Sequence, residues 1–128
     1  MTVALWCILI AIILPYVCTG IAKASGRYNL KDNHDPRDFL ESLNGLGRRA
    51  HAAQLNSFEV TPAFAAAVIV AHLAGNAELV TINVLSVLFI TSRLLYIICY
   101  LADWAILRSL VWFVGMGLIV SFFVVSVG

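Results

Sequence analysis

From Thr2 to Ala24 the sequence reads TVALWCILIAIILPYVCTGIAKA, an apolar run in which Lys23 is the single charged residue. A helix needs roughly 20 predominantly apolar residues to cross the hydrocarbon layer of a bilayer, and this stretch meets that requirement. Three later segments share its character, so the four predicted spans are residues 2–24, 50–74, 78–102 and 107–127. The sequence therefore predicts an all-α fold, a four-helix transmembrane bundle that forms a single membrane domain over residues 1–128.

The composition agrees with lipid as the solvent of this chain. Of the 128 residues, 62% are hydrophobic and 12% are charged, about half the charged fraction of a soluble domain. The formal net charge is +1 and the bases are interleaved with acids, so we do not expect nucleic-acid binding. The three cysteines (Cys7, Cys18 and Cys99) lie inside apolar segments without the paired spacing of zinc ligands, so we expect no metal site.

The basic residues indicate how the bundle is oriented. The connection of residues 25–49 holds or adjoins most of them, namely Lys23, Arg27, Lys31, Arg37, Arg48 and Arg49, whereas the connection around Gly75 has none. The positive-inside rule then places residues 25–49 in the cytoplasm and both termini on the outer side. Within this connection, Pro36 is expected to open a short helix that lies on the membrane surface or under the bundle. Asn44-Gly45 and Gly47 are expected to end it, and its apolar face carries Phe39, Leu40, Leu43 and Leu46.

Two opposite charges lie deep in the predicted spans. Glu59 and Arg93 are each about ten residues from the cytoplasmic end of their span, a depth of roughly 15 Å at 1.5 Å per residue. A lone charge at that depth costs at least ~2.5 kcal/mol, so we expect the two side chains to pair. The pair is either a purely structural salt bridge or also part of a pocket for a polar ligand.

Further polar residues extend from this pair toward the cytoplasm at helical spacing. Intervals of three and four residues place each set on one helix face, and the sets are Arg49, Ala52, Asn56 and Glu59, and Arg93, Tyr96 and Tyr100. Two facing polar stripes would form a cleft for a charged ligand beside lipid. Two other interpretations stay open: the tyrosines are anchors at the membrane interface, and Arg108 either points into the cleft or snorkels to lipid phosphates.

The stretch from Arg49 to Phe64 reads RAHAAQLNSFEVTPAF and resembles the second-helix signature of the MAPEG family, the membrane-associated proteins in eicosanoid and glutathione metabolism. The residues that carry the likeness are Gln54, Asn56, Glu59, Pro62 and Phe64. Arg93-Leu94-Leu95-Tyr96, with Tyr100, is similar to the third-helix signature, and Arg108-Ser109 is similar to the start of the fourth helix. The resemblance covers essentially the whole chain.

The resemblance implies a homotrimer that holds glutathione, as a thiol co-substrate, near the cytoplasmic face between neighbouring subunits. The residues implied to bind or frame it are Gln54, Asn56, Glu59, Arg93, Tyr96 and Tyr100. Arg108 is the implied catalytic residue, because a fixed cation stabilises a thiolate in a poorly hydrated site. The chain departs from many active members at Ala52, where they carry an arginine.

The leading functional hypothesis is an integral membrane glutathione-dependent transferase or peroxidase that acts on lipophilic electrophiles at the cytoplasmic face. The alternative is a non-catalytic trimeric lipid-binding or scaffold protein of the same fold, because family membership alone does not establish an enzyme. The resemblance to short prokaryotic members implies a multi-pass protein of a bacterial inner membrane. A small multidrug transporter would need a carboxylate in its first span, and residues 2–24 contain none.

Overall fold

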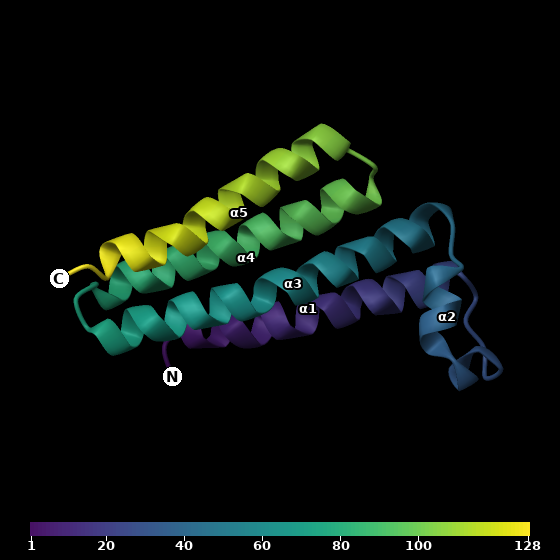
Figure 1. Cartoon of the computed structure of the whole chain (residues 1–128), viewed down its shortest axis with the longest axis horizontal. Helices are drawn as coiled ribbons and strands as arrows, with labels where there is room; N and C mark the ends of the chain where they lie inside the picture. The colour runs from purple at the N-terminus through teal and green to yellow at the C-terminus, as the bar shows by residue number, and fades with distance from the viewer.

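The computed structural model describes residues 1–128 as a bundle of four long helices (Figure 1). These helices are α1 (Val3–Ser25), α3 (Gly45–Ala74), α4 (Leu79–Leu101) and α5 (Ala105–Val125). Two short helices, η1 (Asp32–His34) and α2 (Pro36–Glu41), lie in the connection between α1 and α3. All four long helices are long and apolar enough to cross a membrane. The prediction of an all-α bundle with four candidate spans is confirmed.

Helices α3 and α4 each pack against the other three long helices, while α1 and α5 lie on opposite sides of the bundle. Both termini lie at the end of the bundle opposite α2 (Figure 1). Two hydrogen-bonding contacts fix them beside the α3–α4 turn: Thr2 Oγ1 lies 3.0 Å from His72 Nε2, and Asn76 Nδ2 donates to the Ser126 carbonyl at 3.0 Å. The membrane side that this end faces stays a prediction.

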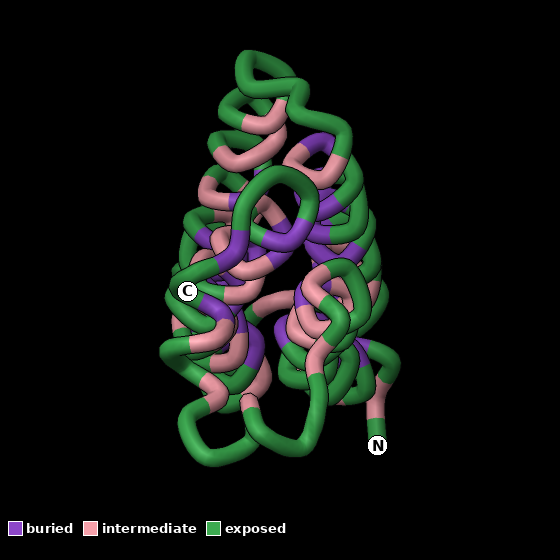
Figure 2. The backbone as a smooth tube through the Cα atoms, turned by 90° about the vertical axis from the view of Figure 1, so that its right-hand side faces the viewer, coloured by how far each residue is buried: buried purple, intermediate pink, exposed green.

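The centre of the bundle is aromatic. Phe64 of α3 stacks on Phe89 of α4 with ring centroids 4.1 Å apart, and it meets Phe122 of α5 edge-on at 6.0 Å. All three side chains are fully buried. Buried positions lie mainly on the helix faces that meet each other, and the outer faces are mostly exposed (Figure 2). These outer faces carry many exposed aliphatic and aromatic side chains, as expected of a surface that meets lipid.

The connection before α3 differs from the sequence-based prediction. Helix α2 ends at Glu41 and α3 already begins at Gly45, so Leu43 lies between the helices and Leu46 belongs to α3. The prediction of one short helix that carries all four apolar residues is therefore wrong. The extended backbone at Asn44 (φ −124°, ψ 166°) and the positive φ of 57° at Gly45 separate the two helices. Leu40 and Leu43 are buried and Leu46 is exposed.

Candidate functional site

Arg93 is held inside the protomer by α3. Its side chain on α4 is only 4% exposed, and its Nη2 donates to Asn56 Oδ1 at 2.8 Å and to Ser57 Oγ at 3.3 Å. No fully buried side-chain nitrogen or oxygen in the chain lacks a hydrogen-bond partner. Since a buried charge is costly unless it is hydrogen-bonded, these contacts explain how Arg93 is accommodated in an apolar helix.

The predicted pairing of Glu59 with Arg93 is wrong within the protomer. Glu59 is exposed, whereas Ser57 is buried against α4. Successive residues are turned by roughly 100° about a helix axis, so Glu59, two positions after Ser57, projects from nearly the opposite side of α3. The polar partners of Arg93 are therefore an amide and a hydroxyl, and the carboxylate of Glu59 is left on the outer surface of the protomer.

Two arginines and two tyrosines form a continuous series of contacts. The series begins at Arg93 and extends toward the end of the bundle that is predicted to face the cytoplasm. The Arg93 Cζ lies 4.3 Å from the centroid of the Tyr96 ring, and the Tyr96 and Tyr100 rings meet edge-on at 5.7 Å. The Arg108 Cζ lies 4.3 Å from the centroid of the Tyr100 ring. Each arginine over an aromatic face is a cation–π contact, which fixes the guanidinium in place. The stack therefore links Arg93, Tyr96, Tyr100 and Arg108, four of the predicted site residues.

A small hollow of about 240 Å³ opens beside this stack, between α3, α4 and α5. Its polar lining comes from Asn56, Tyr96, Arg108 and Ser109, and its apolar wall from Trp112 and Phe113. Arg108 is half-buried and thus partly shielded from solvent. A cation, an amide and two hydroxyl groups beside aromatic side chains suit a small anionic or zwitterionic ligand that lies next to an apolar surface.

Arg49, predicted to belong to the polar stripe of α3, reaches α4 instead. Its Nε donates to the Leu101 carbonyl at 3.2 Å. Leu101 is the last residue of α4, where carbonyl groups lack partners within the helix. A cation at that position satisfies one of these carbonyls and is favoured by the helix dipole, so Arg49 joins α3 to the end of α4.

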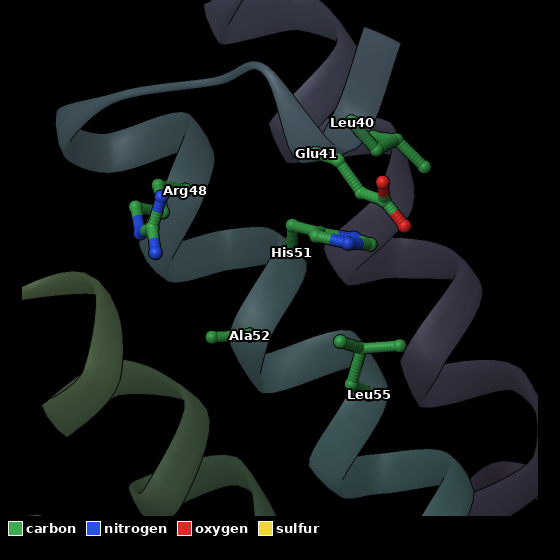
Figure 3. A pocket seen from close by; sticks show the side chains of 6 residues that line it. All are labelled: Leu40, Glu41, Arg48, His51, Ala52 and Leu55. Atoms are coloured by element: carbon green, nitrogen blue, oxygen red, sulfur yellow. The ribbon is translucent and has the colours of Figure 1, made fainter. Parts of the chain in front are cut away.

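Gln54 lies away from the hollow. It is two positions before Asn56, so it projects from nearly the opposite side of α3. Gln54 Oε1 is 3.1 Å from His51 Nδ1, and both residues line a groove of about 530 Å³ beside α1 and α2. A neighbouring hollow of about 370 Å³ is lined in part by Ala52 and Arg48 (Figure 3). The protomer thus brings Asn56, Tyr96 and Arg108 together and separates Gln54 from them.

The sequence reasoning missed Ser57, Ser109 and the aromatic wall of the hollow. Ser57 lies on the buried line of α3 that includes Ala53, Val60 and Phe64, and this spacing of three and four residues was a usable signal. Trp112 follows Arg108 by four residues, which places the two side chains on one face of α5. An apolar wall next to the predicted cation was therefore encoded in the sequence.

Comparison with known proteins agrees with this architecture. No curated protein and no solved structure matches the chain significantly. The family model described as MAPEG family matches residues 3–128, nearly the whole length. The match includes all four long helices and every residue of the hollow. The chain belongs to the MAPEG family.

Proposed function

We propose that this MAPEG member binds glutathione at the hollow between α3, α4 and α5 and transfers its glutathionyl group to lipophilic electrophiles, or reduces lipid peroxides with it. The observation that carries the proposal is the position of Arg108. Its guanidinium is half-buried, lies on the Tyr100 ring and lines the hollow together with Asn56 and Tyr96. A cation fixed in this way is suited to holding an anion at one place.

The chemistry assigned to Arg108 is stabilisation of the glutathione thiolate. A free thiol is only a few per cent ionised at pH 7, and the thiolate is the nucleophile. A nearby guanidinium favours the charged form. In the transferase reaction the sulfur forms a bond with an electrophilic carbon while the leaving group departs with its bonding electrons. In the peroxidase reaction the sulfur attacks a peroxide oxygen, the O–O bond breaks to release the alcohol, and a second glutathione converts the resulting sulfenic acid to the disulfide and water. Asn56 and the Tyr96 hydroxyl supply hydrogen bonds for the polar groups of the tripeptide, and Trp112 and Phe113 supply an apolar surface for a substrate that arrives from lipid.

Two features support a homotrimer with the ligand between subunits, as the family resemblance implies. Gln54 and Asn56 project from opposite flanks of α3, so one ligand can contact both only if they come from different copies of the chain. The exposed Glu59 carboxylate is also costly in lipid, by at least ~2.5 kcal/mol on insertion scales. A neighbouring subunit that covers the Asn56 and Glu59 flank would remove this cost and complete the site.

A second candidate function is favoured by the hydrogen bonds of Arg93. Because Asn56, Ser57 and the Tyr96 ring already satisfy this cation, the buried polar cluster is stable without a ligand. A non-catalytic lipid-binding or scaffold protein would keep Arg93 for packing and would not need Arg108. In both cases we propose a bacterial inner membrane, because the chain resembles short prokaryotic members of the family. The excess of basic residues in the connection of residues 25–49 supports a cytoplasmic position for it.

The test is the ultraviolet difference absorbance of the glutathione thiolate on the purified, detergent-solubilised protein. Addition of glutathione at neutral pH should give a saturable thiolate signal. The signal should be lost in Arg108→Ala and kept in Arg27→Ala, which removes an arginine of the same charge from the connection before α2. A wild-type protein without a thiolate signal would exclude the catalytic proposal. An unchanged signal in Arg108→Ala would exclude Arg108 as the stabilising cation.

A further inference from the structure

The side chain of Asn44 is not held by the fold. It is exposed and makes no capping hydrogen bond to α3, although asparagine is a favoured residue at this position. The chain has five other asparagines, and a hydrogen bond fixes the side chain of each one. These five are Asn29, Asn33, Asn56, Asn76 and Asn83. The carboxamide of Asn44 is therefore the one that can turn toward its own main chain.

Asn44 is also the single asparagine that is followed by a glycine. Gly45 has a φ of 57°, and no atom lies within 4 Å of the place that a Cβ would take. Its N–H is the first of α3, so it has no acceptor within the helix. A backbone nitrogen without a helical hydrogen bond and without a hindering side chain thus directly follows an unrestrained carboxamide.

The start of α3 is accessible to water. Helix α3 has 30 residues, a rise of roughly 45 Å, whereas the hydrocarbon layer of a bilayer is roughly 30 Å thick. Arg48 and Arg49 follow within about one turn of Asn44, and both are suited to headgroup level. The peptide bond between Asn44 and Gly45 therefore lies in water, beyond the acyl chains.

We propose that Asn44 is a modification site at which the chain converts its own asparagine to aspartate and isoaspartate. The Gly45 nitrogen forms a bond to Cγ of Asn44 and gives up its proton, while the Cγ–Nδ2 bond breaks and Nδ2 leaves with a proton as ammonia. Water then opens the resulting succinimide ring at either carbonyl. One opening gives aspartate, and the other gives isoaspartate, in which the main chain passes through Cγ. The reaction needs water alone as a co-reactant.

The two products act differently on the fold. Aspartate places a negative charge at the N-terminus of α3, four residues before Arg48, and both neighbours favour it. Isoaspartate carries the same charge but adds one methylene to the main chain between Leu43 and Gly45. Leu43 is buried in a cluster with Ala22 of α1 and Ala50 of α3. The longer connection loosens this cluster and the attachment of α2 to the end of the bundle.

The experiment ages the purified, detergent-solubilised full chain at neutral and mildly alkaline pH and follows each asparagine by peptide mass mapping. The mass change from amide to acid should appear first at Asn44, and faster at alkaline pH, because the attacking nitrogen must lose its proton. The other five asparagines are internal controls. Asn44→Gln should release less ammonia in total, because its longer side chain closes the ring poorly. Conversion of the other asparagines ahead of Asn44 would overturn the proposal.

A pair of glycine variants tests the mechanism. Gly45→Ala should slow the conversion of Asn44, because its methyl group hinders the approach of the nitrogen to Cγ. Gly75→Ala is the matched control, since Gly75 also has a positive φ, of 70°, and open space around it, and it lies at the other end of α3. It should leave the rate at Asn44 unchanged. Equal rates in the two variants would refute attack by the Gly45 nitrogen.

Limited proteolysis tests the loosened connection. Aged protein, in which chromatography of the peptides shows isoaspartate, should be cleaved within residues 36–44 faster than freshly prepared Asn44→Asp. That variant carries the same charge on a main chain of normal length. Equal cleavage of the two proteins would refute the loosening.

Discussion

Truncation of Asn56 tests how Arg93 is stabilised. In the structure Asn56 Oδ1 is the closer of the two hydrogen-bond acceptors of Arg93, at 2.8 Å against 3.3 Å for Ser57 Oγ. A hydrogen bond to a charged group is worth about 1.5–3 kcal/mol, and the remaining bond to Ser57 retains part of the solvation of the cation. Asn56→Ala should therefore lower the free energy of unfolding by about 2 kcal/mol.

Glu59→Gln is the matched comparison, because it removes a charge one helical turn away that does not contact Arg93. It should not destabilise the protomer, since the carboxylate has no partner within the protomer and its charge is itself costly in lipid. The assay is equilibrium unfolding in mixed detergent micelles at increasing dodecyl sulfate, followed by far-ultraviolet circular dichroism. A Glu59→Gln protein destabilised as much as Asn56→Ala would refute the reasoning and restore a direct Glu59–Arg93 pair.

Two further substitutions test the stack and the core. Tyr100→Phe should keep the ring beneath Arg108 and so retain the thiolate signal. Tyr100→Leu should reduce the signal, because a cation–π contact of about 0.5–1 kcal/mol is lost. Equal signals in the two variants would contradict this role of Tyr100. Phe64→Ala should destabilise the fold by about 3–5 kcal/mol, because it leaves a cavity between two aromatic rings. The exposed Phe113→Ala is its control in the same unfolding assay and should cost far less.

The helices could be predicted from the sequence because apolar runs of membrane-spanning length have few alternatives in lipid. Three of the four predicted spans agree with the observed helices to within two residues at each end. The start of α3 was missed because Gly45 and Gly47 suggest a turn. In the structure the backbone leaves the extended conformation at Gly45, and Gly47 is buried in the first turn of α3.

The contacts among some of the candidate site residues could be predicted from the sequence, and their role in binding stays a prediction. Spacing of three and four residues placed Arg93, Tyr96 and Tyr100 on one face of α4, where their side chains lie in contact, and Arg108 of α5 lies on the Tyr100 ring. The predicted partner of Arg93, Glu59, was wrong because equal depth in the membrane does not fix how each helix is rotated about its own axis. That rotation follows from core packing, and the stacking of Phe64 on Phe89 turns Asn56 and Ser57 toward α4.

The position of Gln54 shows a second limit of a single sequence. Motif residues that act on one ligand need not meet in one protomer, and Gln54 projects from the flank opposite Asn56. Spacing along α3 fixes the angle between the Gln54 and Asn56 side chains about the helix axis. It does not show which surface of another copy lies against either flank of α3. The subunit arrangement therefore stays a prediction of the family resemblance.

Binding of glutathione at the hollow beside Arg108 is measured most directly by an equilibrium titration of the purified full chain with glutathione. We predict saturable binding that is weakened in Tyr96→Leu, which alters the lining of the hollow, and unchanged in Leu94→Ala, which shortens an exposed side chain on another face of α4. Binding that does not saturate, or equal affinity in all three proteins, would contradict the claim.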